Sequence, residues 1–183
     1  MNDMLTLIAG TNRPHSATQK FTNFLANRIQ NTTSLEVKVL DLSAITYNWI
    51  HANMYKKEQV APELENLIEN TLKPADKWIF ITPEYNGSYP GIVKTFLDAI
   101  SVTPFKKEIY GRKAALIGVA SGRAGNLRGM EHLTGVLNYL GFTVYPDKIP
   151  FSSIKNILPE NGIITHEESI AVLDKMIERF SSF

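Results

Sequence analysis

The run Trp-Ile-Phe-Ile-Thr-Pro-Glu-Tyr-Asn, residues 78–86, is the stretch that decides the fold. Its first five residues are apolar or β-branched, which is typical of a strand buried on both faces of a sheet. Pro83 then stops the strand, because proline cannot donate to the hydrogen-bond ladder of a sheet. Polar residues follow at once, so the stretch predicts a central strand that delivers a loop to one edge of a sheet.

Strand-like and helix-like segments alternate on both sides of this run. Strands are expected at 4–9, 35–42, 78–82, 114–120 and 142–149, of which the first, third and fourth are the most apolar and therefore the most central. Helices are expected at 17–30, from Pro62 onward, at 91–100, at 128–140 and after a capping box formed by Thr165 and Glu168. The alternation predicts one α/β domain over residues 1–183, with a five-stranded parallel sheet and helices on both faces.

The composition argues against several classes of protein. The 19 Lys and Arg residues and 18 Asp and Glu residues leave a formal charge of +1, whereas nucleic-acid binders carry a strong basic excess. Cysteine is absent, which excludes disulfide scaffolds, thiol catalysis and iron–sulfur clusters. We find no signal peptide and no run near the roughly 20 apolar residues of a membrane span. We therefore expect a cytoplasmic protein with no nucleic-acid or membrane partner.

Three loops hold the unusual residues of the chain: 10–18, 83–91 and 121–129. Each follows one of the three most apolar strands. In the strand order 2-1-3-4-5 these strands are neighbours, and open parallel sheets bind ligands at the carboxyl ends of such strands. We expect the three loops to converge on one site.

The first loop suits a phosphate group. It leads from a strand into a helix and carries hydroxyls at Thr11, Ser16 and Thr18 beside the cation Arg13, and the positive end of a helix adds free N–H groups. It lacks both the Gly-x-Gly-x-x-Gly of dinucleotide folds and the Gly-Lys-Ser/Thr of triphosphate loops, so a mononucleotide fits better. The alternative is a plain helix cap, with Ser16 capping and Arg13 solvated.

The second loop suits a flat heterocycle. It begins with Pro83, Glu84, Tyr85 and Asn86. Such a turn can present backbone amides, an aromatic face and the donor and acceptor of an asparagine to a planar ring. The alternative is a turn shaped only by proline, asparagine and glycine, which are common turn formers.

The third loop begins at Ser121 and Gly122 and contains further glycines, which allow close backbone approach to a ligand or simply make the loop flexible. The four histidines show no metal-ligand spacing, and we predict no metal site. The long segment 43–61 is rich in apolar residues for a loop; it includes Tyr47, Trp49 and Met54. Loops of this length are often functional.

With these three motifs the chain resembles the NADPH-dependent FMN reductase family of the flavodoxin-like superfamily, which includes quinone, azo-dye and chromate reductases. The resemblance rests on Gly10 to Ser16, on the Pro-Glu-Tyr-Asn at 83–86 with the positions after it, and on Ser121-Gly122. It covers nearly the whole chain and implies a three-layer flavodoxin-like sandwich. By the resemblance, Thr11, Arg13, Ser16 and Thr18 hold the FMN phosphate, and Pro83, Glu84, Tyr85, Asn86, Ser121 and Gly122 hold the isoalloxazine ring.

The resemblance further implies an FMN-dependent oxidoreductase, a homodimer or homotetramer, that passes a hydride from NADPH or NADH to flavin and on to a small acceptor: a quinone, an azo compound, a metal oxyanion or free flavin. The flavin supplies the chemistry, so no catalytic side chain is expected. Two alternatives stay open, a non-enzymatic flavodoxin-type electron carrier and an FMN-binding regulatory protein. Segment 43–61 departs from the family pattern and, if it walls the flavin pocket, would alter the choice of acceptor.

Overall fold

The computed structural model describes residues 4–45, 49–56 and 60–183, and Tyr47 lies outside the described residues. The strands are β1 (Met4–Ala9), β2 (Glu36–Asp41), β3 (Lys77–Pro83), β4 (Lys113–Val119), β5 (Thr143–Val144) and β6 (Ile149–Phe151). The helices are α1 (Ala17–Thr32), α2 (Pro62–Leu67), α3 (Gly91–Ser101), α4 (Lys106–Ile109), α5 (Leu127–Leu140) and α6 (Glu167–Ser182). None of the described helices is long and apolar enough to span a membrane.

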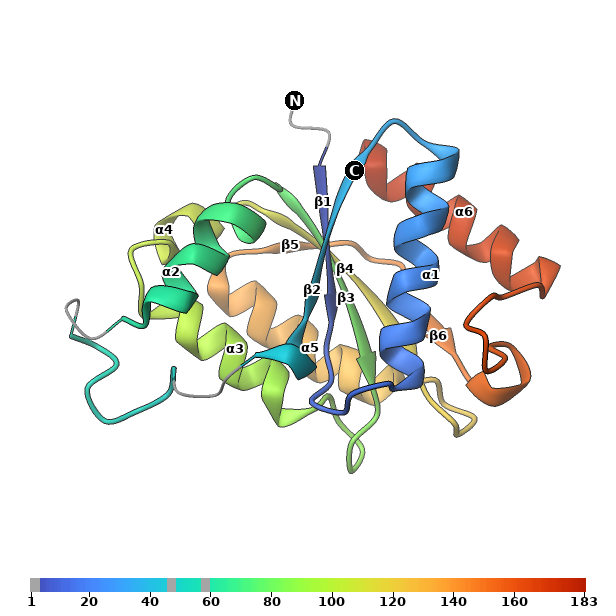
Figure 1. The fold of residues 1–183 in the computed structure, drawn as a ribbon, viewed down its shortest axis with the longest axis horizontal. Coiled ribbons are helices and arrows are strands. Elements are labelled where there is room, and N and C mark those ends of the chain that lie inside the picture. Colours follow the sequence, from blue (N-terminus) through green and yellow to red (C-terminus); the bar gives the residue numbers. More distant parts are fainter. Residues whose placement is uncertain (1–3, 46–48, 57–59) are drawn as a thin grey trace.

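All six strands form one parallel sheet in the order β2-β1-β3-β4-β5, and β6 also pairs with β4. The register aligns Ala9 of β1 with Ile81 of β3, and Ile81 with Ile117 of β4. The strands predicted as central are therefore those with a neighbour on each side. Because the three strands end at nearly the same level, the loops that follow them leave the same edge of the sheet, at the bottom of Figure 1. The predicted flavodoxin-like architecture is confirmed.

Two apolar cores lie on the two faces of the sheet. Helices α1 and α6 cover one face, and α2, α3 and α5 cover the other (Figure 1). Alternate residues of one strand enter opposite cores, so that in β3 Trp78 and Phe80 face α3 while Ile79 and Ile81 face α1. Both faces of the central strands are thus buried, which is why their sequences are continuous apolar runs.

The fifth strand and the last helix differ from the prediction. The expected strand 142–149 is two short strands, β5 and β6, separated around Pro146, which has no N–H to give to the sheet. The prediction of a Thr165–Glu168 capping box is wrong. The structure instead makes His166 the N-cap of α6, its Nδ1 accepting from the N–H of Ser169 at 3.3 Å.

A glycine in β4 lets the third loop fold back onto the sheet. A Cβ added at Gly118 would lie 1.9 Å from the carbonyl oxygen of Gly125, and one added at Gly125 would lie 2.5 Å from Cβ of Pro150. Gly125 also has a positive φ of 55°, which suits glycine. The third loop therefore packs closely over the paired residues Gly118 of β4 and Pro150 of β6, where a side chain on either glycine would not fit.

This packing predicts opposite effects of one substitution at two glycines. Gly118→Ala should lower the free energy of unfolding by about 1–3 kcal/mol, because its methyl group overlaps the Gly125 backbone. Gly135→Ala, on the exposed face of α5 where an added Cβ meets nothing within 4 Å, should raise it by about 0.5–1 kcal/mol. Urea unfolding measures both. Equal stabilities of the two variants would contradict the close approach.

Candidate functional site

The three loops meet in one cavity of about 600 Å³ at the carboxyl edge of the sheet. Its lining includes nine of the ten predicted site residues: Thr11, Arg13, Ser16, Thr18, Pro83, Glu84, Tyr85, Ser121 and Gly122. The lining also includes Ala17, Val119, Ala120, Ile154 and Lys155, which were not predicted. Asn86 does not line the cavity. None of the described residues of segment 43–61 lines it either, and Trp49 is buried in the core on the α3 side of the sheet.

The first loop enters the cavity as the start of α1. Ser16 is the N-cap, and its Oγ accepts a hydrogen bond from the N–H of Gln19 at 3.1 Å. The predicted cap is therefore real, but it uses only one of the free N–H groups in the first turn. Ala17 and Thr18 have no intrahelical acceptor for theirs, and both line the cavity. The cap therefore leaves the N–H groups of Ala17 and Thr18 free to bind an anion.

The second loop is a tight hairpin turn. The N–H of Tyr85 donates to the carbonyl of Ser88 at 2.8 Å, and the N–H of Ser88 donates back to Tyr85 at 3.0 Å. The two central residues, Asn86 and Gly87, have positive φ of 51° and 78°, as a type I′ turn requires and as the Asn-Gly pair favours. Asn86 is exposed and shapes the turn, which holds Tyr85 in place at the cavity.

A hydroxyl pair joins the first loop to the second. Oγ1 of Thr11 lies 3.1 Å from the phenolic oxygen of Tyr85, and the same Oγ1 accepts from the N–H of Arg13 at 3.2 Å. Thr11 is fully buried. The side chain predicted to touch a phosphate therefore positions both the loop that carries Arg13 and the aromatic ring of the second loop.

A buried asparagine joins the second loop to the third. Asn126 is 1% exposed, and its Nδ2 donates to Oγ1 of Thr82 at 2.8 Å and to the carbonyl of Pro83 at 2.9 Å. Its backbone is left-handed, with φ of 63°. Its Oδ1 has no partner among the described residues and faces Gly129, where an added Cβ would lie 2.1 Å away. The sequence analysis did not identify Asn126. An asparagine in a glycine-containing loop is common and gives no local signal of a buried contact.

Further contacts hold the turn of the second loop against α5. Oγ of Ser88 lies 2.9 Å from Nδ1 of His132. Nη1 of Arg128 is 3.2 Å from the point where a Cβ of Gly87 would sit. Beside the turn, burial raises the pKa of the Tyr89 phenol, and Asp98 adds to that rise while Lys94 opposes it. The hydrogen bond and ion pair with Asp98 raise the pKa of Lys94. None of these groups lines the cavity.

The cavity has two parts that differ in the chemical groups lining them. Around the start of α1 it offers a guanidinium, hydroxyls and helix N–H groups, which is the donor set that binds phosphate. Between the second and third loops it offers Tyr85, the backbone of Ser121 and Gly122, and the apolar Val119 and Ala120. A group with a phosphate at one end and a flat ring at the other, such as FMN, fits this donor set.

Comparison with known proteins agrees with this arrangement. A family model described as NADPH-dependent FMN reductase matches residues 4–156. The chain belongs to the NADPH-dependent FMN reductase family. Membership confirms the predicted class of enzyme, an NAD(P)H-dependent reductase with FMN as cofactor.

Individual relatives are distant but broadly collinear. A 2-hydroxy-1,4-benzoquinone reductase of a Burkholderia species is 28% identical over 124 residues, 67% of each chain. An NAD(P)H-dependent FMN reductase of Pseudomonas aeruginosa is 26% identical over 151 residues, 79% of this chain and 76% of its own. Among solved structures, the flavoenzyme FerB of Paracoccus denitrificans superposes with a TM-score of 0.80 at 21% identity, covering 98% of this chain and 95% of its own, which shows a shared fold.

Loss of the Asn126 amide should loosen the junction of the second and third loops. Asn126→Gly keeps the left-handed backbone and removes two short buried hydrogen bonds, so it should lower the free energy of unfolding by about 1–3 kcal/mol. Amide hydrogen exchange at 84–88 should also speed up. Asn138→Ala, at an exposed position on the same helix, is the control and should stay within about 0.5 kcal/mol. A fully stable, normally protected Asn126→Gly protein would refute the role of this amide.

Proposed function

We propose that the cavity binds FMN and that the enzyme passes reducing equivalents from NAD(P)H through it to a small quinone-type or related acceptor. The observation that carries the proposal is the single cavity that joins the anion-binding start of α1 to the aromatic and backbone groups of the other two loops. The names of the relatives support the acceptor class, since one is a benzoquinone reductase and another an FMN reductase.

In this proposal the first loop holds the phosphate. The Arg13 guanidinium and the Ser16 hydroxyl supply donors, together with the free N–H groups of Ala17 and Thr18 at the start of α1. Thr11, whose buried hydroxyl contacts Tyr85 and the N–H of Arg13, positions the loop that carries these donors. The positive end of the helix dipole adds about 0.3–1 kcal/mol at an exposed site, so the charge-assisted hydrogen bonds supply most of the affinity.

The ring lies, in the same proposal, between the second and third loops. Pro83, Glu84 and Tyr85 form one wall, and Ser121 and Gly122 the other. Asn86 contributes through the turn it shapes. An added Cβ at Gly122 would meet nothing within 4 Å, so a planar group can approach this backbone. When bound, FMN accepts a hydride from the nicotinamide and passes electrons onward, while the protein positions the ring and limits access to it.

The other predicted properties extend the proposal. A cytoplasmic location and a homodimer or homotetramer remain predictions. Azo compounds, metal oxyanions and free flavin remain alternative acceptors. A flavodoxin-type carrier would bind FMN in the same cavity but would not react with a nicotinamide, so turnover separates it from the reductase.

The reductase is tested by an anaerobic visible spectrum. Protein with bound FMN should lose its flavin absorbance on addition of NADPH or NADH, faster than free FMN does, and regain it on addition of a benzoquinone. A bound flavin that stays oxidised with both nicotinamides would contradict the reductase and indicate a carrier or a regulatory protein. Absence of FMN binding would refute the site itself.

The phosphate role of the first loop is tested by comparing two flavins. Arg13→Met should raise the Kd for FMN roughly tenfold, the loss expected for a charge-assisted hydrogen bond, and leave riboflavin binding unchanged because riboflavin has no phosphate. Lys175→Met, at an exposed position on α6, is the charge-matched control. Flavin fluorescence measures both ligands. Equal losses for FMN and riboflavin would place Arg13 away from the phosphate.

A further inference from the structure

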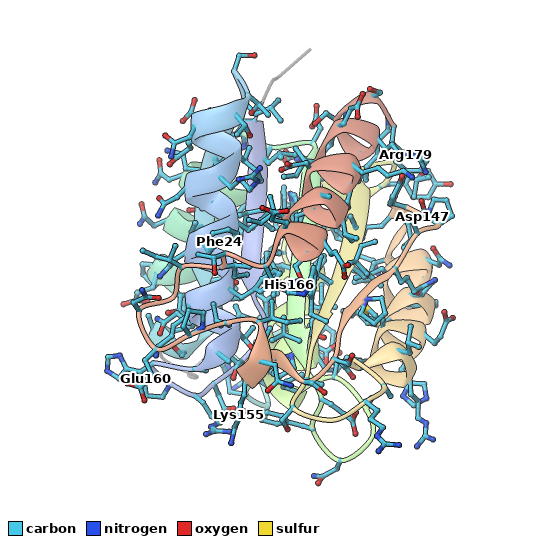
Figure 2. All side chains as sticks on the ribbon, turned by 90° about the vertical axis from the view of Figure 1, so that its right-hand side faces the viewer. Phe24, Asp147, Lys155, Glu160, His166 and Arg179 are labelled. Atoms are coloured by element: carbon cyan, nitrogen blue, oxygen red, sulfur yellow. The ribbon has the colours of Figure 1, made fainter. Side chains whose placement is uncertain are left out.

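A cation from a distant part of the chain lines the same cavity. Lys155 lies in the segment after β6, 26 residues beyond the end of the third loop, and lines the cavity together with Ile154. Figure 2 shows Lys155 at the end of the molecule where α1 begins. The sequence motifs that predicted the site do not include this residue.

The backbone around Lys155 is firmly held. The N–H of Ile154 donates to the carbonyl of Ala120 at 3.0 Å, and the N–H of Ser153 donates to the carbonyl of Gly122 at 3.1 Å. Ile154 is 4% exposed and belongs to the core under α1. Ser153 has φ of 50°, an unfavourable conformation for a residue other than glycine, asparagine or aspartate. A held segment with local backbone strain therefore sets Lys155 at the cavity wall.

The charge of Lys155 has no carboxylate partner. Within the described part of the chain, neither Lys155 nor Arg13 takes part in an ion pair. The neighbouring Lys20 also has no ion pair among the described residues, but its Nζ is held by a hydrogen bond to the backbone carbonyl of Glu160 at 3.0 Å. Two unpaired cations thus line one cavity, Arg13 from the loop after β1 and Lys155 from the segment after β6.

We propose that Lys155 is a second phosphate-binding cation of the cofactor site, facing the phosphate of FMN opposite Arg13. This inference rests on the proposed function. A phosphate monoester carries a charge of about −1.5 to −2 at pH 7, which a single guanidinium does not balance. Arg13 offers a planar fork of donors and Lys155 a compact charge, so the pair neutralises the group from two directions. The segment after β6 is thereby part of the cofactor site.

The test compares FMN with riboflavin in Lys155→Met, with Lys175→Met as the control. Lys155→Met should raise the Kd for FMN roughly tenfold and change that for riboflavin less than twofold, as expected for one charge-assisted hydrogen bond to the phosphate. Lys155→Arg should retain most of the affinity for FMN. The affinity of the wild-type protein for FMN should also fall more steeply with salt than that of Lys155→Met, because the variant has one cation fewer to screen.

Equal losses for FMN and riboflavin would overturn the phosphate role and place Lys155 at the ring or in the structure of the segment. An unchanged Kd for FMN in Lys155→Met would overturn the inference while leaving the proposed function standing. A wild-type protein that binds no FMN would overturn both. Urea unfolding of each variant shows whether the fold is intact.

Discussion

The buried amide of Asn126 is the contact on which the site depends. It donates to the end of β3 and the start of the second loop from within the third loop, at a point where almost no solvent reaches. The Thr11–Tyr85 hydroxyl contact joins the first loop to the second in the same way. The three loops are therefore linked to one another by the protein itself. A site held in this way before binding loses less conformational entropy when a cofactor arrives.

Charge is distributed unevenly in this nearly neutral chain. The net charge of the chain is only +1. The cavity nevertheless has two cations in its lining, Arg13 and Lys155, and Glu84 is the one carboxylate among its described lining residues. Exposed arginines at 123 and 128 lie in or beside the third loop, at the same edge of the sheet. This edge suits anionic small molecules such as nucleotides. It differs from the acidic docking surface expected of a dedicated electron carrier, and it matches the family of reductases to which the chain belongs.

Most of the fold could be predicted from local patterns. Runs such as 78–82 are apolar because both faces of a central strand are buried, and that signal is strong. The fifth strand was harder, since Pro146 interrupts an otherwise strand-like run. Nine of the ten predicted site residues line one cavity, because parallel strands deliver their loops to one edge. Asn126 and Lys155 were missed for a different reason: their importance comes from contacts between residues far apart in sequence, such as Ile154 with Ala120, which no local pattern records.

The central claim is that these linked loops form one FMN site, and a crystal structure of the protein grown with FMN tests it most directly. The account predicts the phosphate at the start of α1, within hydrogen-bonding distance of Arg13 and Ser16, and the ring between Tyr85 and the backbone of Gly122. The opposite edge of the sheet has another cavity, of about 390 Å³, whose lining includes the cations Lys77, Arg112 and Lys113 and the carboxylates Asp76 and Glu108. Flavin bound there, or bound at the carboxyl edge with its ring at the start of α1 and its phosphate in the third loop, would contradict the account.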